Sequence, residues 1–278
     1  MQWIIKYLTS SIGKKQIMGA CGACIALFIL GHMAGNLQLL NPDQEAAQAS
    51  YNAYTQLLTG ATPFIYFIEI GLIAIFAIHI GLAIKLKLEN KSARGNEGYE
   101  VNARKGSKSF ATFTMIWSGL FIVGFMIQHL STLKFGEHYL YMNADGEIVR
   151  DMWLTTIDMF ANPFWTVFYL VSMFAIGMHL FHAISSAFQT MGLAHQKWTP
   201  IIDMVGLIYS IVVALGFAVE AAFSCYIAHQ PEVDALRAKS HDLQPQFDQQ
   251  KKAADEAAAK KTSCVIPSIG EVIISTNV

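Results

Sequence analysis

Five long apolar segments constrain the fold of this 278-residue chain more than any other feature of its sequence. Each is about 20 residues long or longer, the length that an α-helix needs to cross a hydrocarbon layer about 30 Å thick. The chain is 54% hydrophobic and only 14% charged, whereas soluble domains carry roughly 25% charged residues. The sequence therefore predicts an all-α, polytopic membrane protein. Its five transmembrane helices are expected at residues 17–40, 63–84, 110–133, 164–188 and 201–227.

Lysine and arginine residues predict the direction in which these helices cross the membrane. Eleven of them border the span ends on the side of the amino terminus, and two border the ends on the opposite side. Because positive residues gather in cytoplasmic loops, we expect a cytoplasmic amino terminus and a carboxy terminus outside. The net charge of -1 argues against nucleic acid as a partner.

Composition divides the chain into three regions. Residues 1–16 form a basic, amphipathic cytoplasmic leader, for which an interfacial helix and a flexible segment are both open interpretations. Residues 17–228 contain the five spans. Residues 229–278 form a charged extramembrane tail, interpreted as either a helix or a solvated chain. Within that tail, the apolar stretch 265–275 is predicted to be a short strand or a docking segment.

Four histidines lie deep inside four different apolar segments. At a rise of about 1.5 Å per residue, His32 and His129 reach similar depths toward the outer face. His79 and His179 reach similar depths toward the cytoplasm. Ionisable side chains inside membrane helices usually face the protein interior and mark cofactors, counter-ions or ion pathways. The sequence therefore predicts two facing pairs, an outer pair (His32 and His129) and an inner pair (His79 and His179).

Two imidazoles that face each other across a helix bundle can provide both axial ligands of a six-coordinate b-type haem. We therefore predict a four-helix bundle with two haems, in which the outer and inner pairs bind one iron each. Such an iron has no open position, so the haems are expected to carry electrons. For any one histidine alone, a polar contact or a proton relay is an alternative. His182 follows His179 by one helical turn, and it is interpreted as a partner of a propionate or a backbone carbonyl, or as the ligand itself.

Haem propionates need cationic or hydroxyl partners at the membrane edges. Candidates at the cytoplasmic ends of the second and third spans are Lys85, Arg104, Lys108 and Ser109. For the lysines, an equally good interpretation is that they only mark the cytoplasmic side. Tyr51, Tyr54 and Gln56 border the outer end of the second span and are candidates of the same kind.

The sequence motifs around the four histidines resemble those of one known family. They are GHMAGN around His32, HIGLAIKLK from His79, QHLSTL around His129 and GMHLFHAISSAFQTMG around His179. They resemble the cytochrome b membrane subunit of succinate dehydrogenase and fumarate reductase, in its single-chain form with five helices and two haems. The resemblance runs from about residue 14 to residue 228. It implies that the outer pair binds the distal haem and the inner pair the proximal haem, and it favours His179 over His182 as the ligand.

The resemblance also implies partners and a reaction. The family subunit anchors a flavoprotein with FAD and an iron-sulfur protein on the cytoplasmic face of the bacterial inner membrane. It passes electrons between them and quinone, often menaquinone, near the distal haem. Glu69, two to three turns outward of His79, is a candidate for proton exchange with quinol or for a polar contact between helices. Gly177 stands where some fumarate reductases of the family have a glutamate, which favours a succinate dehydrogenase.

Two other functions remain open from the sequence. The first is the dihaem subunit of another quinone-linked oxidoreductase, such as a membrane hydrogenase. The second is a transporter whose histidines relay protons, although the sequence shows no convincing repeat of the kind that many transporters contain.

Overall fold

The computed structural model describes residues 2–60, 62–95, 108–193 and 195–274. In this part of the chain nearly all regular structure is helical. The long helices are α2 (Ser11–Asn36), α4 (Thr62–Arg94), α5 (Lys108–His129), α7 (Pro163–Thr190), α8 (Thr199–Ala228) and α9 (Pro231–Ile274). The shorter elements are α1 (Gln2–Thr9), η1 (Leu37–Leu40), α3 (Gln44–Gly60), η2 (Leu130–Lys134), β1 (Leu140–Met142), β2 (Ile148–Arg150) and α6 (Met152–Met159).

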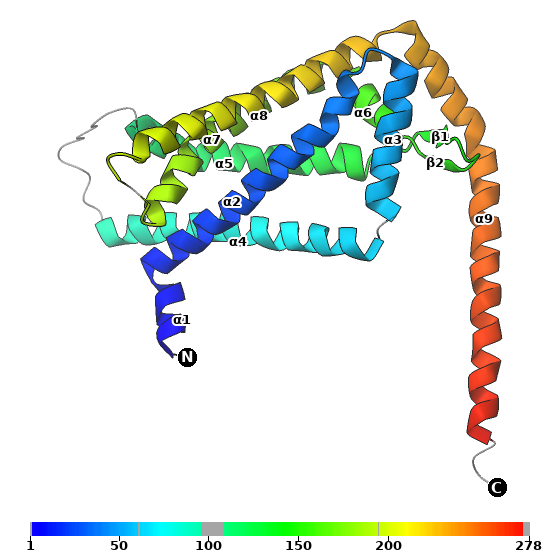
Figure 1. Ribbon diagram of the computed structural model, residues 1–278, viewed down its shortest axis with the longest axis horizontal. Coiled ribbons are helices and arrows are strands. Elements are labelled where there is room, and N and C mark those ends of the chain that lie inside the picture. The colour runs from blue at the N-terminus through cyan, green and yellow to red at the C-terminus, as the bar shows by residue number, and fades with distance from the viewer. Residues whose placement is uncertain (1, 61, 96–107, 194, 275–278) are drawn as a thin grey trace.

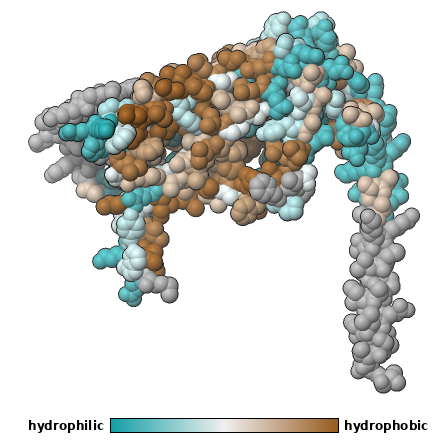
Figure 2. Space-filling model, in the orientation of Figure 1, coloured by the Kyte–Doolittle hydropathy of each residue, from teal (hydrophilic) through white to brown (hydrophobic). Residues whose placement is uncertain are grey.

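Five segments are long and apolar enough to cross a membrane. They are Ser11–Leu40, Ile65–Ala93, Thr114–Lys134, Pro163–Thr190 and Thr199–Ala228. The prediction of an all-α chain with five helices of spanning length is thereby confirmed. Figure 2 shows apolar surface over the body formed by these helices and polar surface where α8 meets α9.

The spanning helices lie side by side, as Figure 1 shows. Helix α2 packs against α4 and α7, and α5 and α8 both pack against α7. Helices α7 and α8 approach closely at Gly177, where an added Cβ atom would lie 3.0 Å from the Cβ atom of Ala214. The position that the family resemblance associates with a glutamate is therefore occupied here by a close helix contact.

Two helices leave the body at its two ends (Figure 1). At the end where α2 begins, α1 exposes apolar side chains, among them Trp3, Ile5 and Leu8. The leader is thus helical, as one of its two interpretations predicted. At the other end, α9 remains helical through Ile274, so the short strand predicted for residues 265–275 was wrong. The first part of α9 is packed rather than solvated, since Val233 is fully buried.

Segments between the spans and after the last one fold into a compact structure that was not predicted from the sequence. This structure, here called the cap, comprises residues 37–60, 137–162 and 229–247, and it contains α3, α6 and the antiparallel β1–β2 hairpin. Its buried core includes Leu39, Tyr51, Trp153, Ile157 and Val233. The cap therefore joins the ends of α2, α7 and α8 through tertiary contacts.

Asn52 and Asp151 hold the start of α6 inside the cap. Both side chains are fully buried. The side chain of Asn52 donates to Asp151 Oδ1 at 2.8 Å and accepts from the backbone N–H groups of Met152 and Trp153 at 2.9 and 3.1 Å. Burial raises the pKa of Asp151, against the opposing effect of the hydrogen bonds that its carboxyl group accepts. Asn52 thus satisfies polar groups that would otherwise be buried without partners.

Replacing Asn52 by alanine is expected to destabilise the cap. The change leaves two backbone N–H groups without their acceptor and removes one of the hydrogen bonds that the Asp151 carboxyl group accepts. Together these losses cost about 3 kcal/mol. Thermal unfolding in detergent, followed by tryptophan fluorescence, should show a lower midpoint. Asn41→Ala is the matched control, because the exposed Asn41 side chain accepts one backbone N–H in a turn. Equal midpoints for the two variants would contradict the assigned role of Asn52.

Candidate cofactor-binding site

The outer pair is brought into direct contact by α2 and α5. The ring centroids of His32 and His129 lie 5.9 Å apart, with an interplanar angle of 88°. Aromatic side chains surround the pair: Phe28 stacks on His32 at 5.6 Å, Phe217 lies 5.7 Å from it, and Phe125 lies 5.5 Å from His129. The two imidazoles therefore face each other in an apolar environment.

The backbone changes its geometry immediately after His129. This histidine ends α5, and the next five residues form the π-helical turn η2. Single π-turns inside α-helices occur frequently at functional sites. The side chain of Arg150 donates to the backbone carbonyls of Leu133 and Lys134, at 2.7 and 3.1 Å. Arg150 thus satisfies carbonyl groups at the end of the helix that presents His129.

The inner pair is supplied by α4 and α7. The rings of His79 and His179 interact electrostatically. Each ring also lies against a glycine of a neighbouring helix. A Cβ atom added at Gly22 in α2 would lie 3.2 Å from Cε1 of His79, and one added at Gly119 in α5 would lie 3.6 Å from Cε1 of His179. The absence of a side chain at these positions leaves room for the imidazoles.

Hydrogen bonds at Nδ1 fix the tautomer of both inner histidines. Nδ1 of His79 lies 3.0 Å from the backbone carbonyl of Met18. A carbonyl only accepts, so Nδ1 carries the proton and Nε2 keeps its lone pair. Nδ1 of His179 lies 3.1 Å from Oγ of Ser118, whose own hydrogen is donated to the carbonyl of Met115. Ser118 therefore accepts from His179, which has the same tautomer.

His129 has a comparable partner at the outer level. Its Nδ1 lies 3.1 Å from the hydroxyl oxygen of Tyr169 in α7. Metal-binding histidines almost always use their second ring nitrogen in a hydrogen bond of this kind, which orients the ring and leaves the other nitrogen for the metal. Three of the four predicted ligands have this arrangement.

These distances can be compared with the requirements of a haem iron. An imidazole nitrogen binds a transition metal at about 2 Å, so the centroids of two imidazoles on opposite sides of one iron lie roughly 6 Å apart. The spacing of 5.9 Å in the outer pair agrees with this value. In the described part of the chain, no group of three or more His, Cys, Asp or Glu residues is placed to hold a metal ion. A haem needs only two protein ligands, because the porphyrin supplies the rest, and so the residues present fit a bis-histidine haem.

The other predicted site residues lie at different distances from the pairs. His182 is half-buried on α7 and interacts electrostatically with His179. Glu69 forms an ion pair with Lys134 at 2.5 Å, in which both side chains are more than one-third exposed. Arg104 lies outside the described residues. Lys108 and Ser109 begin α5, but their side chains lie outside the described part of the structure.

Sequence reasoning missed two buried charged residues. Lys14 at the start of α2 is 8% exposed and forms an ion pair of 2.5 Å with Glu89 near the end of α4. Glu220 in α8 is 3% exposed. A signal for Glu220 was present in the sequence, because a carboxylate inside an apolar span usually has a function.

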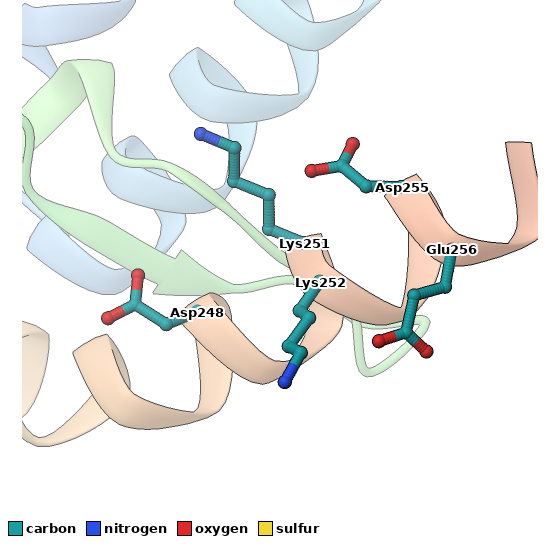
Figure 3. A pocket seen from close by; sticks show the side chains of 5 residues that line it. All are labelled: Asp248, Lys251, Lys252, Asp255 and Glu256. Carbon is teal, nitrogen blue, oxygen red and sulfur yellow. The ribbon is translucent and has the colours of Figure 1, made fainter. Parts of the chain in front are cut away.

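A hollow on the surface of α9 is lined by charged residues. They are Asp248, Lys251, Lys252, Asp255 and Glu256. Figure 3 shows that Lys251 and Asp255 point to one side of the helix, and Lys252 and Glu256 to the other. Charges of both signs that diverge from one exposed helix do not form a cofactor site.

The chain was compared with protein-family models, curated proteins and solved structures, and none of them matches it. The assignment of a function therefore depends on the residues and the geometry described above.

Proposed function

We propose that this chain is a dihaem cytochrome b that anchors succinate dehydrogenase or fumarate reductase in the bacterial inner membrane. It would pass electrons between the iron-sulfur subunit and a membrane quinone, most simply menaquinone, in a complex that works mainly as a succinate dehydrogenase. The observation that carries the proposal is the pairing of four histidines from four apolar helices at two levels. The motif resemblance around those histidines adds the identity of the partners.

Each residue near the pairs has a defined task in this proposal. A haem, when bound, supplies a one-electron carrier. The histidines present Nε2 to the iron, while Met18, Ser118 and Tyr169 hold three of the rings in position. Phe28 and Phe217 exclude water from the outer level.

The two levels are separated along α2. Gly22 contacts the inner level and His32 belongs to the outer one. At about 1.5 Å per residue, this separation is roughly 15 Å along the helix axis. Two carriers stacked in this way would connect the two sides of the membrane. In the proposal, the flavoprotein and iron-sulfur subunits bind at the end where α2 begins, which is the cytoplasmic end.

The proposal is tested on the protein purified from its native membrane. A dithionite-reduced spectrum should show b-type bands equivalent to two haems per chain, and the flavoprotein and iron-sulfur subunits should copurify. Succinate should then reduce the haems in the complex. A spectrum without b-type bands would overturn the haem assignment. Haems that respond to hydrogen but not to succinate would instead indicate a hydrogenase-type complex.

Ser118→Ala is expected to weaken haem binding at the inner level. It removes the hydrogen bond that orients His179, and the loss of such a partner typically weakens metal binding about 10- to 100-fold. The haem content of the purified variant, titrated with added haem, measures this change. Ser131→Ala is the matched control, since Ser131 is exposed and donates only to a backbone carbonyl. Identical titrations for the two variants would show that Ser118 does not orient the ligand.

A further inference from the structure

Glu220 is a carboxyl group buried inside the last apolar helix. Its side chain is 3% exposed, and Oε1 has no hydrogen-bond partner in the described part of the chain. It follows Phe217 by nearly one turn on α8, and Phe217 packs against His32. One turn beyond Glu220, the hydroxyl group of Ser224 is fully buried and also has no partner among the described residues. Glu220 and Ser224 thus form a stripe of buried polar groups without hydrogen-bond partners among the described residues. The stripe begins one turn from Phe217, which contacts the outer pair.

Tyr51 connects this stripe to the cap. It interacts electrostatically with Glu220 and forms a hydrogen bond with Thr156 in α6. Its hydroxyl group donates to Oδ1 of Asn36 at 3.1 Å, and Asn36 lies one turn after His32 on α2. Burial raises the pKa of Tyr51 to about 12. The Tyr51 hydroxyl group therefore stays neutral and can both donate and accept a proton.

Because Glu220 is buried, a nearby positive charge decides whether its carboxyl group is ionised or protonated. An ionised carboxylate without a partner is strongly disfavoured in an apolar interior, unless a positive charge lies nearby. With two neutral imidazole ligands, oxidised haem iron in a porphyrin carries a net positive charge, and reduction removes that charge. The electrostatic cost of ionising Glu220 therefore differs between the two redox states of a haem at the outer pair.

We propose that Glu220 is a redox-linked proton site of the outer haem. Glu220 binds one proton when that haem gains one electron, from the partner subunits or from quinol, and releases the proton when the electron leaves. The net charge of the buried region then stays constant. Tyr51 passes the proton between Glu220 and the cap. This inference depends on the proposed function, because it requires a haem between His32 and His129.

Other ionisable groups lie on the elements that pack around this region. They are His32 on α2, Tyr51 on α3, Asp158 on α6, Tyr169 on α7 and Arg237 on α9. Asp158 is paired with Arg237 at 2.6 Å, and Tyr169 contacts His129. Asp158 is thus paired, whereas Glu220 has no ionic partner among the described residues.

The test is a redox titration of both haems in the purified native complex over a series of pH values. In the wild-type protein the potential of the outer haem should fall as the pH rises. The limit is about 59 mV for each tenfold change in proton concentration, as for any one-electron couple linked to one proton. Glu220→Gln, which keeps the shape but cannot ionise, should remove the slope for the outer haem only. Glu232→Gln is the control and should keep the slope, because Glu232 is exposed in the first turn of α9.

The possible results separate this inference from the proposed function. A slope that persists in Glu220→Gln would overturn the role of Glu220 and leave the dihaem assignment intact. A wild-type protein without haem would overturn both. If Glu220→Gln does not fold, Glu220→Asp should keep the slope. Infrared difference spectra of the wild-type protein and of Glu220→Asp should also contain a carboxylic C=O band that appears on reduction and differs between the two. The same band in both proteins, or no band, would overturn the inference.

Discussion

Replacement of His32 by alanine is expected to leave one haem per chain, and His129→Ala should remove the same haem. The two rings face each other at 5.9 Å, so either substitution removes one of the two axial ligands of a single iron. His79→Ala and His179→Ala should instead remove the inner haem. Haem content measured as the pyridine adduct gives the number of haems, and a redox titration identifies which one remains.

Two control variants make the histidine result decisive. His138→Ala should retain both haems, because His138 is exposed in the loop before β1. His182→Ala should also retain both if His179 is the ligand. Loss of different haems in His32→Ala and His129→Ala would contradict the pairing. Loss of the inner haem in His182→Ala, with retention in His179→Ala, would transfer the ligand role to His182.

Gly22→Leu is expected to weaken haem binding at the inner level and to spare the outer one. Even a Cβ atom at this position would lie 3.2 Å from Cε1 of His79, so a leucine must displace the imidazole. Overpacking of this kind typically costs 1–3 kcal/mol, which corresponds to a decrease in affinity of about 5- to 150-fold. Titration of the purified variant with added haem should show weaker binding at the inner level and unchanged binding at the outer level.

Ala20→Leu is the matched control for this substitution. Ala20 lies on the same helix, and its side chain is exposed. The added volume therefore meets no neighbouring helix, and both haems should remain. Equal haem contents in Gly22→Leu and Ala20→Leu would show that Gly22 does not provide the space for His79.

The helices and the histidine levels were predictable for a simple physical reason. The length of an apolar segment indicates a span, and the constant rise of an α-helix converts sequence position into depth. His32 and His129 are therefore matched by counting residues alone. Depth does not determine the direction in which a side chain points around the helix. Glu69 has a suitable depth, yet its half-exposed carboxylate pairs with Lys134.

The cap could not be predicted, because its core depends on contacts between segments that are distant in the sequence. Helix α3 mixes apolar and polar residues, and its buried Asn52 and Gln48 both bind Asp151, about a hundred residues later. Local patterns do not reveal such partners. For the same reason sequence reasoning missed Glu220, which interacts electrostatically with Tyr51 from a distant part of the sequence.

The core of the cap is built from early, middle and late parts of the chain, and this determines the order in which the cap can assemble. Tyr51 follows the first span, Trp153 precedes the fourth, and Val233 follows the last, and all three belong to one buried cluster. During synthesis the early spans must therefore wait, with the apolar side of α3 uncovered, until the last span has been inserted and α9 has emerged. Contacts between residues so far apart in the sequence form slowly. The outer histidine pair consequently reaches its final surroundings late, and under the proposed function this delay would give a haem time to enter before the cap closes over that end of the bundle.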